Sequence, residues 1–134
     1  MKKILCLDFD GVIHAYTRGW KGADVIPDDA VSGALEFIEQ ARHVFRIAIY
    51  SSRSHQHGGI AAMQNWMHQK LAAYAPDRAD EIFAAIEWPT AKPAAFLTID
   101  DRALTFTGVW PDVDALLTFK PWIDILPALK DGDS

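Results

Sequence analysis

An apolar run that ends in two carboxylates is the feature that most constrains this fold. Residues 4–7 are all apolar and lead directly into Asp8-Phe9-Asp10-Gly11. A short continuous apolar run indicates a buried strand, and period-two geometry then places Asp8 and Asp10 on one side, with Phe9 pointing away. Gly11 permits a sharp turn and a close approach of the backbone to a ligand. The sequence therefore predicts two carboxylates at the C-terminal end of a buried strand.

Two neighbouring carboxylates repel each other unless a cation or a shared proton relieves them. Mg²⁺ would do so, because hard cations prefer oxygen ligands. An Asp-x-Asp triplet alone is weak evidence, since such triplets also occur in turns and on solvated surfaces. Its position favours a functional site, because open α/β sheets bind ligands beyond the carboxyl ends of their strands.

Strand-like and helix-like patterns alternate along the rest of the chain. Further strands are expected at 45–50, 86–88, 94–99 and 104–107, and helices at 27–43, 60–74, 76–83 and 112–117. This alternation predicts an α/β fold, a three-layer α/β/α sandwich with a central parallel sheet of Rossmann type. We expect a single domain over residues 1–130, including an apolar segment 119–129 packed on the body, and a frayed tail at 131–134.

Composition excludes several classes of protein. The net charge of −5 over 134 residues argues against a general nucleic-acid coat protein. The single cysteine, Cys6, provides neither a disulfide framework nor a Cys-rich metal site, and its place in a strand indicates a core residue in a reducing compartment. The N-terminal apolar run is too short for a signal sequence or a membrane span. We expect a cytoplasmic protein without membrane contact.

Polar residues also follow the later strands. Ser51 comes directly after the second strand, Lys92 lies in the loop before the fourth, and Asp100-Asp101 follows the fourth. Because the carboxyl ends of parallel strands share one edge of a sheet, these groups are expected to converge with Asp8 and Asp10. Each has a simpler explanation, Ser51 as a turn cap and Lys92 as a solvated lysine, but their common position favours a site.

In this order the motifs resemble those of the haloacid dehalogenase (HAD) superfamily of phosphohydrolases. Asp8-Phe9-Asp10-Gly11-Val12 is similar to motif one, Tyr50-Ser51-Ser52-Arg53 to motif two, and Lys92 with Ile99-Asp100-Asp101 to motifs three and four. The resemblance covers residues 4–101. Asp10 favours phosphoryl chemistry within the superfamily, because a dehalogenase needs neither a leaving-group acid nor magnesium.

The resemblance implies a Mg²⁺-dependent phosphatase that hydrolyses a phosphate monoester through an aspartyl phosphate. Asp8 would be the nucleophile, Asp10 the acid and base, and Ser51 and Lys92 the groups that hold the phosphoryl oxygens. The metal ligands would be Asp8, the Asp10 backbone carbonyl, and Asp100 or Asp101. We favour Asp100 as the direct ligand, with Asp101 behind it or paired with Lys92.

The chain is too short for the cap domain of larger members, so the resemblance is to a capless type with an open site. Such a site admits a large substrate, or a second subunit of a homo-oligomer covers it. Ser51-Ser52-Arg53 is also similar to the second motif of polynucleotide 3′-phosphatases, which suggests a nucleotide or a nucleic-acid 3′-phosphate. Segment 13–27 is expected to be a flap or a surface loop with an aromatic anchor. The residues expected to contact substrate are Phe9, Ser52, Arg53, Arg18 and Trp20.

Two other functions use a similar scaffold. A phosphate-accepting receiver domain also places acidic groups, a hydroxyl and a lysine around Mg²⁺, although its acidic pair follows a different order along the chain. A catalytically idle phosphate-binding module is the second alternative. Its usual mark is the loss of a motif residue, and this sequence has lost none.

Overall fold

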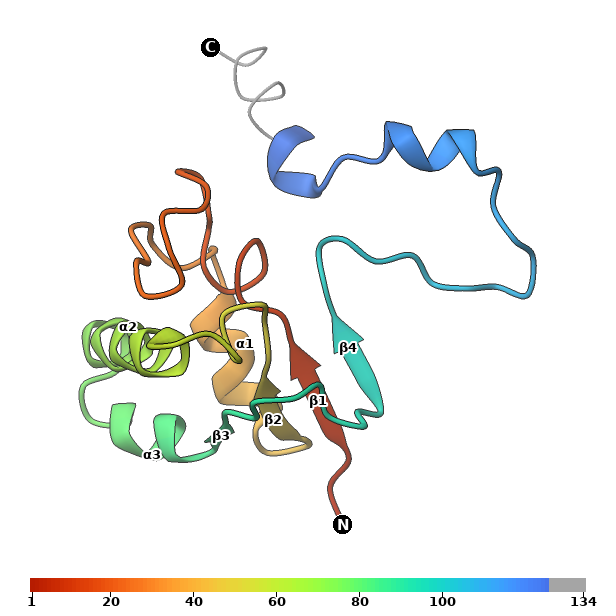
Figure 1. The fold of residues 1–134 in the computed structure, drawn as a ribbon. Coiled ribbons are helices and arrows are strands. Elements are labelled where there is room, and N and C mark those ends of the chain that lie inside the picture. Colours follow the sequence, from red (N-terminus) through yellow and green to blue (C-terminus); the bar gives the residue numbers. More distant parts are fainter. Residues whose placement is uncertain (126–134) are drawn as a thin grey trace.

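The computed structural model describes residues 1–125 of the 134-residue chain. It contains a four-stranded sheet made of β1 (Ile4–Leu7), β2 (Arg46–Ile49), β3 (Ile86–Glu87) and β4 (Leu97–Ile99). The strands lie in the order β3-β2-β1-β4 and all neighbouring pairs are parallel. The predicted mixed α/β fold with a parallel sheet flanked by helices is therefore confirmed (Figure 1).

Three α-helices connect the first three strands. They are α1 (Ala34–Ala41), α2 (Gly59–Tyr74) and α3 (Ala79–Ala84), and α2 contacts both of the others. A short 3₁₀ helix, η1 (Asp114–Thr118), follows β4. Among the described residues, no helix has the length and apolar character needed to cross a membrane.

Alternation along β1 and β2 separates the two faces of the sheet. Leu5, Leu7, Ile47 and Ile49 are buried in one cluster with apolar side chains of the helices. Between them stand the smaller residues Cys6 and Ala48, which are also buried. The connection from β3 to β4 passes across β2 and β1 in Figure 1, and its Lys92 shares a cleft with Cys6. The main core thus lies between the sheet and the helices.

Helix α1 begins later than the sequence pattern indicates. The predicted helix from residue 27 starts only at Ala34, directly after Gly33, whose φ of 84° is left-handed and incompatible with a continuous helix. The preceding residues instead bond to the segment after β1: Asp29 accepts from the Ala15 N–H, and the Val31 N–H donates to the Ile13 carbonyl. Tertiary hydrogen bonds therefore replace the first turns of the predicted helix.

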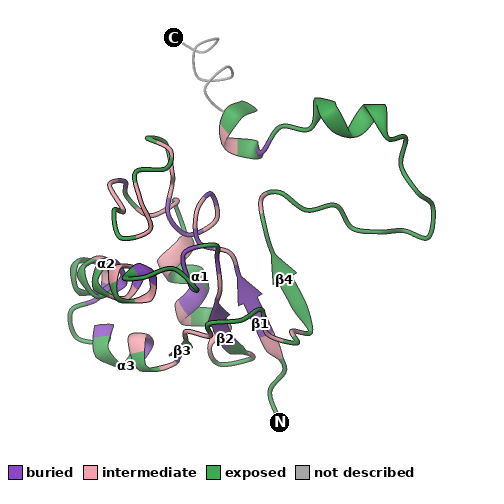
Figure 2. Cartoon of the chain, in the orientation of Figure 1, coloured by how far each residue is buried: buried purple, intermediate pink, exposed green. Residues whose placement is uncertain are grey.

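The chain after β4 departs furthest from expectation. Residues 104–107 form no strand, and the stretch from 102 to 120 projects from the body with nearly all of its side chains exposed (Figures 1 and 2). Asp112 does accept a hydrogen bond from the Ala115 N–H at 3.1 Å, beside η1. The chain returns to the body at the buried Pro121 and at Trp122, whose indole N–H donates to the Gly11 carbonyl at 2.6 Å. The expected packing of residues 126–129 and the frayed tail at 131–134 lie outside the described residues.

Candidate active site

Three carboxylates meet at the C-terminal ends of the neighbouring strands β1 and β4. Asp8 follows β1, and Asp100 and Asp101 follow β4, which pairs with β1. One oxygen from each of the three lies within 4.8 Å of the others, a spacing at which they can hold a metal ion. The structure thus brings together both members of the acidic pair with Asp8. The Asp10 side chain is outside this group, and the expected ligand from Asp10 was its backbone carbonyl.

Burial and mutual repulsion change the protonation of Asp8. Burial raises the pKa of Asp8 to about 7, the charges of Asp100 and Asp101 add to the rise, and a hydrogen bond from the Phe9 N–H, 2.8 Å from Oδ1, opposes it. Burial also raises the pKa of Asp101. A cluster of carboxylates that resists ionisation in this way is one that a cation would stabilise.

Gly11 is required by the close approach of Asp101. Its φ of 82° is left-handed, and a Cβ placed on it would overlap the Asp101 carboxylate. The turn after β1 therefore gives the second acidic residue room to reach Asp8. The predicted sharp turn at Gly11 is present, and the group that approaches it is the Asp101 carboxylate. The close approach of the backbone to a ligand stays a prediction.

A cleft of about 170 Å³ extends from Asp8 toward the β3–β4 connection. Ser51, Ser52, Lys92 and Asp100 line it together with Asp8. Ser51 is buried, and its hydroxyl oxygen accepts a hydrogen bond from the Arg53 N–H at 3.0 Å while the hydroxyl donates to Met63 Sδ at 3.7 Å. Within residues 1–125, Lys92 forms no ion pair, so the suggested pairing with Asp101 is absent and the ammonium group is free to bind an anion.

Asp10 is held by a buried arginine. The Arg53 side chain is fully buried, and its Nε and Nη2 donate to the two Asp10 oxygens at 2.9 and 3.2 Å. Its Nη1 donates to the carbonyls of Gly22, Ala23 and Val25 at 2.9–3.1 Å. Arg53 therefore ties the segment after β1 to Asp10. Arg53 was expected to contact substrate, but its donors already bind these groups, and it does not line the cleft of Asp8, Ser51 and Lys92.

His14 supplies the second contact to Asp10. Its Nδ1 lies 2.9 Å from Asp10 Oδ1, and its Nε2 accepts a hydrogen bond from the Asp28 N–H at 3.0 Å. Because Nε2 accepts, Nδ1 carries the ring proton and donates it to Asp10. Burial alone would raise the pKa of Asp10, but the hydrogen bonds from His14 and Arg53 outweigh burial and lower that pKa.

The other residues expected to contact substrate differ in their burial and in whether they line a cleft beside Asp8. Phe9 is fully buried in the core, with its ring against His14 and Trp66, because it points away from Asp8 and Asp10 as strand geometry requires. Arg18 pairs with Asp28 at 3.2 Å. It lines neither the cleft of Ser51 and Lys92 nor a second cleft beside Asp8 that is described below. The two remaining residues, Ser52 and Trp20, do line these clefts.

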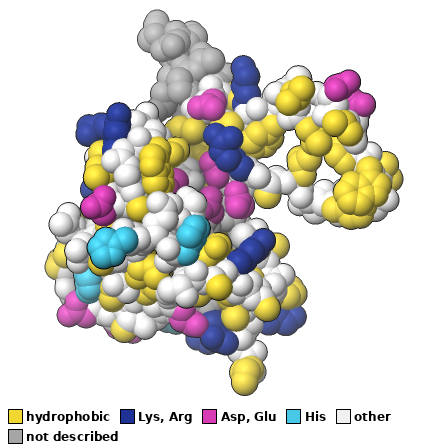
Figure 3. All heavy atoms as spheres, in the orientation of Figure 1, with side chains coloured by type: hydrophobic (Ala, Val, Ile, Leu, Met, Phe, Trp, Pro, Cys, Tyr) yellow, Lys and Arg dark blue, Asp and Glu magenta, His cyan; other side chains and the backbone are white. Residues whose placement is uncertain are grey.

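A second cleft of about 170 Å³ shares Asp8 and Ser52 with the first. It is lined by Asp8, Asp10, Tyr16, Trp20, Ser52, Asp101 and Arg102. Sequence reasoning missed Tyr16 and Arg102, and also His14. The only signal in the sequence was the position of Tyr16 and His14 in the irregular segment after motif one and of Arg102 directly after motif four. Figure 3 shows acidic and basic side chains gathered where the projecting 102–120 segment meets the body.

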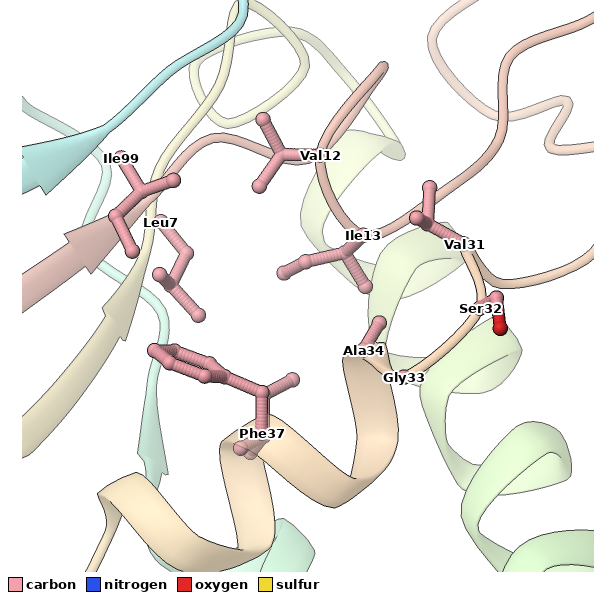
Figure 4. A pocket seen from close by; sticks show the side chains of 10 residues that line it. Leu7, Val12, Ile13, Val31, Ser32, Gly33, Ala34, Phe37 and Ile99 are labelled. Atoms are coloured by element: carbon pink, nitrogen blue, oxygen red, sulfur yellow. The ribbon is translucent and has the colours of Figure 1, made fainter.

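An apolar pocket of about 240 Å³ lies below this edge, between α1 and the ends of β1 and β4 (Figure 4). Its lining includes Leu7, Ile13, Phe37 and Ile99, and it contains no ionisable side chain. Chemistry at this edge of the sheet therefore belongs to the two polar clefts that share Asp8.

No family model, curated protein or solved structure matched this chain. The functional assignment therefore rests on the geometry around Asp8 and on the order of the motifs that bring these residues together.

Proposed function

We propose that this chain is a Mg²⁺-dependent phosphoric monoester hydrolase of the HAD type, without a cap domain. The observation that carries the proposal is the surroundings of Asp8. This carboxylate belongs both to a potential metal site with Asp100 and Asp101 and to a cleft that Ser51 and Lys92 line. A carboxylate nucleophile, hydroxyl and ammonium donors and a cation site are the parts that phosphoryl transfer requires.

The residues present fit a magnesium ion. Asp8, Asp100 and Asp101 offer three carboxylate oxygens close together, which are ligands of the kind that Mg²⁺ prefers. Both Asp100 and Asp101 are near enough to be direct ligands. When bound, Mg²⁺ would supply positive charge that offsets these carboxylates and the oxygens of the phosphoryl group.

In the first step, an Asp8 oxygen attacks the phosphorus and the bond to the leaving oxygen breaks. The phosphoryl oxygens are held by the Lys92 ammonium group and by the Ser51 hydroxyl, which exchanges its hydrogen bond to Met63 Sδ for one to the phosphoryl group. The product is an aspartyl phosphate on Asp8. In the second step, water attacks the phosphorus, the bond to Asp8 breaks, and inorganic phosphate leaves.

Asp10 handles the protons of both steps. His14 and Arg53 favour its ionised form in the free protein, which suits it to accept a proton from the attacking water. To protonate a leaving group it must first be protonated itself. A phosphate dianion bound beside Asp10 favours this change, because a nearby negative charge raises a carboxyl pKa.

The finer fold follows from the same proposal. A complete three-layer sandwich of HAD type needs a layer on the sheet face that carries Cys6 and Ala48. In the described part of the chain, the β3–β4 connection occupies this face near Lys92. We assign that connection as a shortened form of the layer that covers the Cys6 and Ala48 face of the sheet in a capless enzyme.

The proposal is tested by Asp8→Asn, with Asp77→Asn as the control at a carboxylate that is 73% exposed on the surface. Against a panel of phosphate monoesters with Mg²⁺, Asp8→Asn should reduce turnover by several orders of magnitude, because an amide is not a nucleophile. Asp77→Asn should retain full activity, and EDTA should abolish the activity of the wild type. Full activity of Asp8→Asn would overturn the proposal. A stable phosphoenzyme without turnover in the wild type would instead support a receiver-like module.

A further inference from the structure

The two clefts beside Asp8 divide the proposed reaction between them. The cleft with Ser51 and Lys92 holds the donors for the phosphoryl oxygens, whereas the other contains Asp10, the proposed acid. An acid must lie beside the oxygen that it protonates. The second cleft is therefore on the side of the leaving group, and its remaining side chains indicate what that group is.

Two aromatic side chains line this second cleft. The guanidinium carbon of Arg53, Cζ, lies 4.7 Å from the centroid of the Trp20 ring. Trp20 nevertheless remains 45% exposed. Tyr16 has a φ of 61° and is the only non-glycine residue with a positive φ among those described. This conformation is uncommon for a tyrosine, and here it accompanies a side chain that lines the cleft beside Asp10.

Arg102 adds a positive charge to the same cleft. It is exposed, and its backbone N–H donates to Asp100 Oδ1 at 2.7 Å, which fixes the start of the side chain. Its guanidinium forms no ion pair with any carboxylate in residues 1–125. Arg102 partly offsets the charge of the acidic cluster, and its free donors can also pair with an anion in a bidentate manner.

We infer that the cleft of Tyr16, Trp20 and Arg102 binds a nucleotide leaving group, with the base against Trp20 and a second phosphate on Arg102. This inference rests on the proposed phosphatase function. The required substrate has a scissile phosphate, a base and another phosphate. A free nucleoside bisphosphate and the phosphorylated end of an oligonucleotide share this chemistry. The net charge of −5 is compatible with either, because only one nucleotide is held.

Four substrates separate the contributions: glycerol 2-phosphate, a nucleoside 3′-phosphate, a nucleoside 3′,5′-bisphosphate and a 3′-phosphorylated trinucleotide. Trp20→Ala should lower kcat/KM by about tenfold for the three substrates with a base. It should change kcat/KM for glycerol 2-phosphate less than twofold, and Trp20→Phe should restore most of the loss. Phe37→Ala, at an aromatic residue of nearly equal exposure (44%) outside the cleft, should change none of the four.

At saturating Mg²⁺, Arg102→Gln should lower kcat/KM about tenfold more for the two substrates with a second phosphate than for the nucleoside 3′-phosphate. A trinucleotide that exceeds the bisphosphate in kcat/KM identifies an oligonucleotide end as the source, and the reverse order identifies the free nucleotide. Equal losses on all four substrates in Trp20→Ala, or no preference of the wild type for a base, would overturn the inference while the phosphatase function stands.

Binding separates the two proposals when turnover is absent. Asp8→Asn with Mg²⁺ should bind the trinucleotide in a calorimetric titration, and Trp20→Ala in that background should weaken binding by about tenfold. Binding without wild-type turnover would overturn the phosphatase function alone. Absence of both binding and turnover would overturn both.

Discussion

Asp10 has its protonation and its orientation determined by two buried side chains, His14 and Arg53. Two hydrogen bonds from Arg53 fix both of its oxygens, and His14 adds a third contact. The same guanidinium crosslinks residues 22–25, so the shape of the leaving-group side depends on it. Arg53 is thus a positioning residue for Asp10 and for the segment that carries Trp20.

Arg53→Met should lower the free energy of unfolding by about 3–5 kcal/mol, because it leaves a partly buried carboxylate and three carbonyls without their donor. The matched control is Arg78→Met, at an exposed arginine paired with Glu39, which should cost less than about 1 kcal/mol. Urea denaturation of the two variants measures the difference. Equal and small losses would show that the Asp10–Arg53 pair does not stabilise the fold.

At the scale of the elements, sequence periodicity is sufficient where one face is buried continuously. β1, β2 and α2 lie close to their predicted positions, because uninterrupted apolar runs and regular helical spacing identify them. The predicted helix from residue 27 failed because Gly33 adopts a left-handed φ and because residues 29–31 bond to the segment after β1, a tertiary contact. The predicted strand at 104–107 failed because no neighbouring strand pairs with it in the described part of the chain.

The candidate site also contains residues that could be predicted from the sequence and residues that could not. Asp8, Ser51, Lys92 and the acidic pair at 100–101 could be predicted, because each is adjacent to the end of a strand or precedes the next one. The roles of His14, Tyr16, Arg53 and Arg102 could not, since they depend on contacts between residues distant in sequence or on an unusual backbone angle. Burial of Arg53 in particular has no counterpart in the sequence pattern.

Two glycines of the segment after β1 test whether the turn itself forms the metal site. Gly11 and Gly19 both have positive φ, but only Gly11 has the Asp101 carboxylate where a Cβ would be placed. Gly19→Ala should cost about 1 kcal/mol and leave Mg²⁺ affinity unchanged. Gly11→Ala should in addition weaken Mg²⁺ binding at least tenfold, measured by calorimetric titration. Equal Mg²⁺ affinity in the two variants would contradict the proposed close approach of Asp101.

At the scale of the whole molecule, apolar surface is concentrated after β4. The exposed large side chains of this region are Leu104, Phe106, Val109, Trp110, Val113, Leu116, Leu117 and Phe119. Exposed apolar side chains gathered in one segment are typical of an interaction surface. That a second subunit covers the site beside this segment stays a prediction.

We therefore predict that the protein self-associates through this segment. The wild type should elute with a mass above the 14.9 kDa of one chain, in a concentration-dependent manner, in size-exclusion chromatography with light scattering. The double substitution Trp110→Ser and Leu117→Ser should shift it to the monomer. Val44→Ser, at an apolar residue that is 64% exposed elsewhere on the surface, should leave the elution unchanged. A wild type that is monomeric at every concentration would contradict the prediction.

In the proposed reaction, Asp8 forms a covalent bond to phosphorus and Asp10 promotes the hydrolysis of that bond. The most direct measurement is rapid acid quenching of Asp10→Asn with p-nitrophenyl phosphate and Mg²⁺, followed by peptide mass spectrometry. This leaving group needs no proton, so the first step should proceed while the second slows by about 10²–10⁴-fold. We expect a burst of nitrophenol and a phosphorylated peptide modified at Asp8. Turnover without a phosphopeptide, or a phosphate located on any other residue, would contradict it.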